Sequence, residues 1–228
     1  MEFIKNFKNL TKFELILWII SLSVVTLSFM LVPDKDILSL TASIIGVTAL
    51  IFVSKGYVLG QVLTVVFSVF YGIISFFFSY YGEMITYLFM TSPMAIMSAI
   101  EWYKNPYKKT KIVKVNIATK KEITVMLILS IIVTGIFYFI LKALWNANLF
   151  FSTISITTSF IASYLTYLRS PYYALAYSMN DIVLIILWIL ASIENISYVP
   201  MIFCFAMFLI NDLYGFYNWR KMMKKQAE

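Results

Sequence analysis

The chain has 228 residues, of which 61% are hydrophobic and only 13% are charged, and it carries a net charge of +7 with no histidine. A soluble domain is nearer half apolar and a quarter charged, so this composition excludes a soluble protein and predicts an all-α integral membrane protein. Histidine-based metal sites and proton relays are excluded, and the single cysteine, Cys204, cannot form an intrachain disulfide. No phosphate-binding loop or catalytic signature is visible, so we expect no enzymatic activity, no cofactor and no metal ion.

Eight apolar runs are long enough to cross the hydrocarbon core of a bilayer as helices. In chain order they are Leu15–Val32, Ile37–Ser54, Tyr57–Tyr80, Met84–Ile100, Ile123–Leu141, Leu149–Leu168, Tyr172–Ile193 and Met201–Trp219. The first run follows lysines, as a signal sequence does, but Pro33 and Asp34 stand where a small-residue cleavage site would follow. Thr11 and Glu14 have the spacing of a capping box, so this helix is expected to be retained.

The basic residues gather in alternate loops between the predicted helices, and this distribution predicts the orientation of the protein in the membrane. Cytoplasmic loops carry an excess of Lys and Arg. With the N-terminus inside, all of the 18 Lys and Arg residues except Lys35 and Lys142 fall on the cytoplasmic side, from Lys5 to the C-terminal tail. We therefore expect a multi-pass protein of the cell membrane with both termini and the loop Lys104–Lys121 in the cytoplasm, and we attribute the positive charge to topology rather than to nucleic acid binding.

An internal repeat relates two triplets of helices. Similar residues recur 114 or 117 positions apart; the pairs are Thr41 and Ser155, Ser43 and Thr157, Lys55 and Arg169, and Trp102 and Trp219. The single helix Ile123–Leu141 between the triplets returns the chain to its starting side, so the halves are predicted to be parallel. Small transporters with such repeats bind their substrate between the halves, near the bilayer midplane.

The repeat divides the chain into five parts. They are an N-terminal cytoplasmic segment with an extra transmembrane helix (1–36), a first three-helix bundle (37–102), a cytoplasmic loop and linker helix (103–147), a second three-helix bundle (148–219) and a basic cytoplasmic tail (220–228).

Polar residues at membrane depth are costly, and they mark candidate functional sites. The predicted substrate-binding residues are Asn180, Tyr173, Tyr177, Asn211, Asn218, Trp102 and Thr91, and the polar or proton-linked ones are Asp181, Asp212 and Glu101. Amides can bond to ring edges and sugar hydroxyls, and Tyr and Trp stack on flat rings, so a heteroaromatic ligand bearing a sugar is favoured over an inorganic ion. The alternative is that these groups bridge helices or belong to the interfacial aromatic belt.

Two segments resemble the PnuC vitamin transporters. Tyr80–Lys104 reads YYGEMITYLFMTSPMAIMSAIEWYK and is similar to the end of the family's first repeat; Asn211–Met222 reads NDLYGFYNWRKM and is similar to the end of the second. Asn180 falls where the family places an Asn after two aromatic positions. The resemblance implies two parallel three-helix bundles joined by a linker helix, related to the SWEET proteins. It also implies facilitated diffusion of nicotinamide riboside or a similar nucleoside-like vitamin, followed by trapping by a separate cytoplasmic kinase.

Several alternatives remain open in the sequence. Tyr173 and Ala176 stand where nicotinamide riboside carriers commonly have Trp, and Ala95 and Ala99 where they often have Gln and Trp, so another nucleoside or deoxynucleoside is an alternative substrate. Asp181 and Asp212 leave proton coupling open. A membrane scaffold subunit is the alternative outside transport, and a homo-oligomer is among the assembly states that the sequence allows.

Overall fold

The computed structural model describes residues 7–34, 36–77, 81–108, 110–146 and 148–228. Four residues used in the predictions, namely Lys5, Lys35, Tyr80 and Lys109, lie outside these ranges. The helical segments are α2 (Lys12–Leu31), α3 (Ile37–Ser54), α4 (Val58–Phe77), α5 (Tyr81–Thr86), the π-helical turn η1 (Tyr87–Thr91), α6 (Ser92–Lys104), α7 (Lys120–Ala143), α8 (Leu149–Tyr167), α9 (Tyr173–Glu194), the 3₁₀ turn η2 (Ile196–Tyr198) and α10 (Val199–Ala227).

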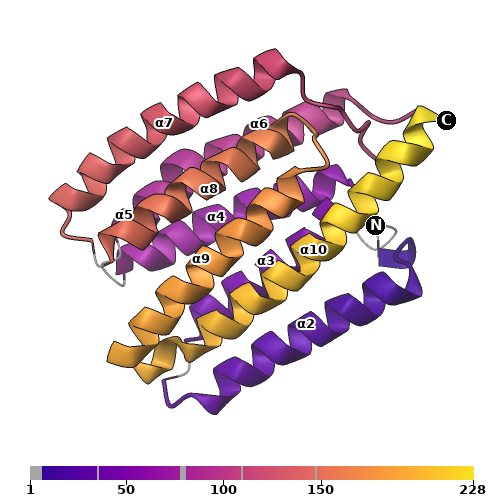
Figure 1. Cartoon of the computed structure of the whole chain (residues 1–228). Helices are drawn as coiled ribbons and strands as arrows, with labels where there is room; N and C mark the ends of the chain where they lie inside the picture. Colours follow the sequence, from indigo (N-terminus) through magenta and orange to yellow (C-terminus); the bar gives the residue numbers. More distant parts are fainter. Residues whose placement is uncertain (1–6, 35, 78–80, 109, 147) are drawn as a thin grey trace.

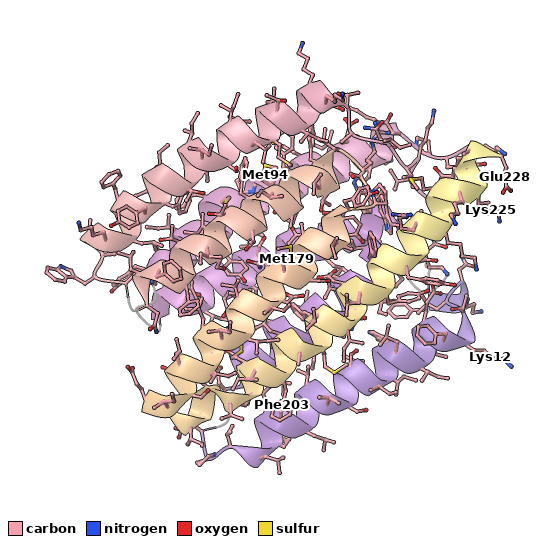
Figure 2. The ribbon with its side chains drawn as sticks, in the orientation of Figure 1. Lys12, Met94, Met179, Phe203, Lys225 and Glu228 are labelled. Carbon is pink, nitrogen blue, oxygen red and sulfur yellow. The ribbon has the colours of Figure 1, made fainter. Side chains whose placement is uncertain are left out.

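In the part of the chain that the structure describes, eight helical spans are long and apolar enough to cross a membrane, which confirms the predicted number. Their outward surfaces are apolar, as the half-exposed side chains of Met179 and Phe203 illustrate, whereas the charged groups of Lys12 and Lys225 lie at one end of the bundle (Figure 2). The start of α2, the C-terminus and the connection between α6 and α7 lie at this end, which we call the termini end (Figure 1). Such an apolar girdle with charged ends fits a protein surrounded by lipid.

Six spans form a closed ring. Within each half, neighbours along the chain pack together: α3 on α4 and α4 on α6 in the first half, α8 on α9 and α9 on α10 in the second. Between the halves, α6 packs on α8 and α10 packs on α3. These two interfaces are equivalent under the repeat, because α8 corresponds to α3 and α10 to α6. The prediction of two parallel three-helix bundles is confirmed, with α7 as the linker along one edge and α2 along the opposite edge (Figure 1).

Local capping explains where several helices begin. The predicted capping box is confirmed, since the Thr11 hydroxyl accepts from the backbone N–H of Glu14 and the Glu14 carboxylate accepts from that of Thr11. A second capping box, formed by Thr119 and Glu122, starts α7. Asp36 caps α3 by accepting from two backbone N–H groups. Each cap satisfies amide groups that have no partner inside their own helix.

Most helix ends lie within about three residues of the predicted ones, and two helices extend further. The fourth span, predicted as Met84–Ile100, runs from Tyr81 to Lys104 and contains the π-helical turn η1. The last helix, predicted to end at Trp219, continues to Ala227, so the basic tail is helical. The sequence RKMMKKQA that follows Trp219 contains good helix formers and neither glycine nor proline, which lets the helix extend beyond the apolar run.

A buried ion pair docks α2 against the ring. The Lys55 ammonium lies 2.6 Å from the Glu14 carboxylate, whose side chain is only 2% exposed. The Tyr214 hydroxyl donates to the other carboxylate oxygen at 2.9 Å. Glu14 therefore joins α2 to the end of α3 and to α10 through one carboxylate.

We predict that Glu14→Gln lowers the free energy of unfolding by about 3–5 kcal/mol, because it leaves the Lys55 ammonium partly buried without a counter-charge. The matched control is Glu101→Gln, whose pair with Arg169 is longer, at 3.4 Å, and more exposed, so a loss of at most about 1 kcal/mol is expected. Chemical and thermal unfolding of the detergent-purified proteins measures both. The two variants losing equal stability would contradict the assignment of Glu14 as the docking group.

Candidate functional site

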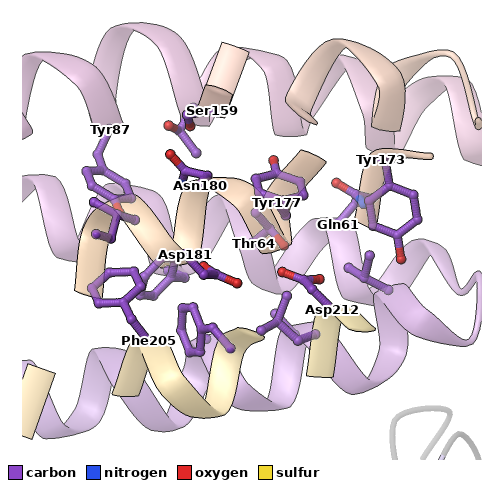
Figure 3. A pocket seen from close by; sticks show the side chains of 18 residues that line it. Gln61, Thr64, Tyr87, Ser159, Tyr173, Tyr177, Asn180, Asp181, Phe205 and Asp212 are labelled. Atoms are coloured by element: carbon purple, nitrogen blue, oxygen red, sulfur yellow. The ribbon is translucent and has the colours of Figure 1, made fainter. Parts of the chain in front are cut away.

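A cavity of about 80 Å³ lies inside the six-helix ring, and its mainly apolar wall carries several polar side chains (Figure 3). Every span of the ring contributes to its wall, with the extra helix α2 and the linker α7 absent from the lining. Its polar lining residues are Gln61, Thr64, Tyr87, Thr91, Ser159, Tyr173, Tyr177, Asn180, Asp181 and Asp212. The cavity thus lies between the two halves, where the parallel repeat predicts a substrate site.

Helix α9 supplies one wall of this cavity. Tyr173, Tyr177 and Asn180 are spaced i, i+4 and i+7, which puts them on one helical face, and all three line the cavity. The Asn180 amide oxygen accepts from the hydroxyls of Ser155 at 3.2 Å and Thr158 at 2.8 Å, both on α8. These two bonds fix the orientation of the amide, and its NH₂ group has no partner among the described residues. Asn180 therefore presents a fixed donor to the cavity.

Two carboxyl groups face each other across the junction of α9 and α10. Asp181 and Asp212 point toward one another in Figure 3, and each is 3% exposed. One Asp181 oxygen, Oδ2, is buried without a hydrogen-bond partner. No described Lys or Arg forms an ion pair with either group. Among the described residues, the cavity lining therefore contains two acids and no basic side chain.

The opposite wall contains a residue that the sequence reasoning missed. Gln61 on α4 lines the cavity, is 3% exposed, and its amide has no hydrogen-bond partner among the described residues. Thr64, one turn further along α4, also lines it. Gln61 is the only amide or charged residue between Val58 and Phe77, so its isolation in an apolar run was the signal that could have identified it.

The π-helical turn η1 shapes the third part of the wall. The Ser92 backbone N–H donates to the Tyr87 carbonyl five residues earlier, and Pro93 follows directly. The turn before Pro93 is therefore wider than an α-helical turn, and Tyr87 and Thr91 both line the cavity. Single π-turns inside α-helices often occur at functional sites.

Two of the predicted site residues lie away from the cavity and hold helices together. The Asn211 amide donates to the Ser21 hydroxyl of α2 at 2.9 Å and to the Met207 carbonyl at 2.7 Å. The Asn218 amide donates to the Ser54 carbonyl at the end of α3, at 2.9 Å. Both residues thus have the helix-bridging role that was the alternative interpretation.

Trp102 is also outside the cavity, in a reciprocal contact at the termini end. The Trp102 indole N–H donates to the Thr166 carbonyl of the second half at 2.9 Å, and the Trp219 indole N–H donates to the Val53 carbonyl of the first half at 3.0 Å. The two rings pack with centroids 5.1 Å apart. The cavity-lining ring of Tyr173 packs on Trp219 at 4.9 Å. The tryptophan pair therefore closes the cavity toward the termini end.

Glu101 lies at the same end and does not line the cavity. Its carboxylate accepts from the Asn105 amide at 2.9 Å and lies 3.4 Å from the Arg169 guanidinium. This contact joins α6 to the turn between α8 and α9, so the structure gives Glu101 a bridging role.

A second, larger cavity of about 270 Å³ opens at the end of the bundle away from the termini. Its lining includes the acids Asp34, Asp36 and Glu83 together with Tyr71 and Trp188. The ring of Tyr71 packs on that of the central-cavity residue Tyr87, with centroids 4.6 Å apart. Aromatic side chains therefore separate the two cavities.

Comparison with known proteins supplies the family. The model of the nicotinamide mononucleotide transporter family matches residues 36–221. The nicotinamide riboside transporter PnuC of Neisseria mucosa is 25% identical over 226 residues, covering 97% of this chain and 86% of the relative. The protein of the same name from Haemophilus influenzae is 24% identical over 227 residues, covering 98% and 95%. The crystal structure of the vitamin B3 transporter PnuC matches with a TM-score of 0.80 at 24% identity, over 96% of this chain and 94% of that one, which supports the fold.

Proposed function

The chain belongs to the nicotinamide mononucleotide transporter family, and on that premise we propose that it carries nicotinamide riboside, or a closely related nucleoside, through the central cavity. Membership of this family makes the protein a multi-pass membrane transporter and not an enzyme. The names of the two relatives support the riboside as substrate. Other nucleosides or deoxynucleosides are the alternative.

The proposal rests on the amide groups and aromatic rings that line the cavity between the two halves. The unpartnered amide groups of Asn180 and Gln61 lie on opposite walls and can bond to a carboxamide or to ribose hydroxyls. The rings of Tyr177, Phe67 and Phe208 also line the cavity and offer surfaces for a flat heterocycle. A small nucleoside combines these two kinds of group.

The charge of the cavity favours the riboside over its 5′-phosphate. Among the lining residues there is no Lys or Arg to pair with a phosphate dianion. Asp181 and Asp212 are buried in the same cavity and would repel an anion. We therefore propose that the transported species is unphosphorylated.

We predict that purified protein binds nicotinamide riboside and does not bind nicotinamide mononucleotide at the same concentration, measured by isothermal titration calorimetry or thermal shift. Asn180→Leu and Gln61→Leu should each weaken riboside binding by about tenfold, because each removes an amide that faces the cavity. Asn211→Leu is the control, because that amide docks α2, and it should lower stability with little effect on affinity.

Binding of the mononucleotide as tightly as the riboside would contradict this proposal. So would unchanged riboside affinity in both cavity variants together with a loss of affinity in the folded Asn211→Leu protein.

We propose that transport is facilitated diffusion, followed by phosphorylation of the substrate by a separate cytoplasmic kinase. No phosphate-binding loop is present to support ATP hydrolysis by that route. The buried pair of Asp181 and Asp212 supports the alternative of a proton-coupled carrier, since intramembrane acids often serve as proton relays.

We predict that proteoliposomes without a kinase bring radiolabelled riboside to equal concentrations on both sides when the membrane potential is clamped at zero. An imposed pH gradient should leave this endpoint unchanged. Uphill accumulation that follows the pH gradient and disappears in Asp181→Asn or Asp212→Asn would establish the proton-coupled alternative instead.

We propose that the termini end of the bundle faces the cytoplasm. The lysine-rich connection between α6 and α7, the start of α2 and the C-terminus share this end, and cytoplasmic loops are enriched in Lys and Arg (Figure 1). In a Cys204→Ser background, we predict that Lys111→Cys resists an impermeant thiol reagent in intact cells and reacts after permeabilisation. Trp145→Cys, at a 94% exposed position of the opposite end, should react in intact cells. The reverse labelling pattern would invert the orientation.

A further inference from the structure

The carboxyl pair of the central cavity lacks a positive partner. Asp181 and Asp212 are each 3% exposed, they point toward one another, and no described Lys or Arg pairs with them (Figure 3). Asp181 Oδ2 is buried with no hydrogen-bond partner. The neighbouring cavity side chains that also titrate are the hydroxyl-bearing Tyr87, Tyr173 and Tyr177, none of which can supply positive charge.

Burying two carboxylates next to each other costs electrostatic free energy unless a proton or a cation neutralises part of their charge. Two carboxylates side by side, shielded from water, disfavour each other's charged form. A shared proton relieves part of the repulsion, and a cation held between or beside them relieves more. No described residue provides such a cation at this position, which points to a positively charged ligand.

A second observation favours a ligand that carries hydrogen-bonding groups as well as charge. Gln61, on the wall formed by α4, is 3% exposed and its amide has no partner among the described residues. A buried amide left unbonded is unfavourable, so the group is positioned to bond to something that enters the cavity. Aromatic rings, among them Phe205 and Phe208, complete the lining next to the acids, and ring faces attract organic cations.

We propose that the Asp181–Asp212 pair is the counter-charge for a positively charged heteroaromatic ring, so that the cavity selects cationic ribosides over neutral nucleosides. This inference rests on the proposed function and narrows its substrate class. In nicotinamide riboside the glycosidic nitrogen belongs to a pyridinium ring that carries a permanent positive charge. The ring would lie against the two carboxyl groups, while its carboxamide and ribose would bond to the amides of Gln61 and Asn180.

The test compares two ligands of nearly the same shape that differ in charge. One is nicotinamide riboside, and the other is benzamide riboside, in which a neutral benzene carbon replaces the charged ring nitrogen. Their affinities for the purified full-length protein are measured by competition against radiolabelled nicotinamide riboside and by calorimetry. We expect the wild-type protein to prefer the cation by at least about tenfold, since one unit charge beside a poorly solvated carboxylate is strongly stabilised.

Three variants assign the preference to particular groups. The double variant Asp181→Asn/Asp212→Asn should lose it, with the affinity for the cation falling and that for the neutral ligand unchanged or improved. Each single variant retains one carboxylate and should keep part of the preference. Glu101→Gln removes an acid outside the cavity and should bind both ligands as the wild type does.

The possible outcomes distinguish a failure of the cation preference from a failure of the proposed transport function. Equal affinity of the wild-type protein for the two ligands overturns the inference and leaves riboside transport standing; this comparison does not depend on the folding of any variant. A folded double variant that still prefers the cation tenfold also overturns it. Binding of neither ligand contradicts the proposed function itself.

Discussion

The two halves of the molecule are held together at one end by a pair of hydrogen bonds that cross between them. The indole N–H of Trp102 reaches a carbonyl of α8, and the indole N–H of Trp219 reaches a carbonyl of α3, while the two rings pack on each other. Both indoles are almost completely buried, so an unbonded N–H would be costly there. Because this contact joins the halves below the cavity, the middle of the six-helix ring can remain open and polar while the ring stays closed.

Buried polar groups need hydrogen-bond partners, and this requirement helps to distinguish the polar groups that join helices from those that face a ligand. The NH₂ groups of Asn211 and Asn218 donate to α2 and α3, and both residues lie outside the cavity. The Asn211 amide oxygen is buried and has no partner among the described residues, so an unmet partner marks a ligand site only where it lines a cavity. Gln61 and Asp181 line the cavity and carry groups with no partner among the described residues. In a lipid-embedded bundle, water cannot satisfy such groups from outside, so an unmet partner inside a polar cavity is the physical mark of a site for a ligand.

The fold could be predicted from the sequence because its signals are long or repeated. The number of spans follows from eight apolar runs, and the start of the first helix follows from the capping box at Thr11 and Glu14. The pairing of the two repeats follows from tryptophans at their matching ends. The site was harder to predict. The spacing of Tyr173, Tyr177 and Asn180 on α9 identified a face that lines the cavity. Asn211 and Asn218 were predicted in the same way but bond to α2 and α3, because the sequence of a single helix does not reveal which neighbour covers a given face. Gln61 stands alone among the amide and charged residues of its helix. The π-helical turn that brings Tyr87 and Thr91 into the wall rests on a backbone hydrogen bond from Ser92 to Tyr87, which side-chain patterns do not specify.

The central claim is that the cavity between the halves holds the transported molecule, with its ring at the two acids. An experimental structure of the full chain bound to nicotinamide riboside tests this most directly. The ligand should lie within the six-helix ring, with its pyridinium ring beside Asp181 and Asp212 and polar contacts to Asn180 and Gln61. A ligand seated instead in the second cavity, beside Glu83 and Trp188, or in the central cavity with its ring turned away from both acids, would contradict the account.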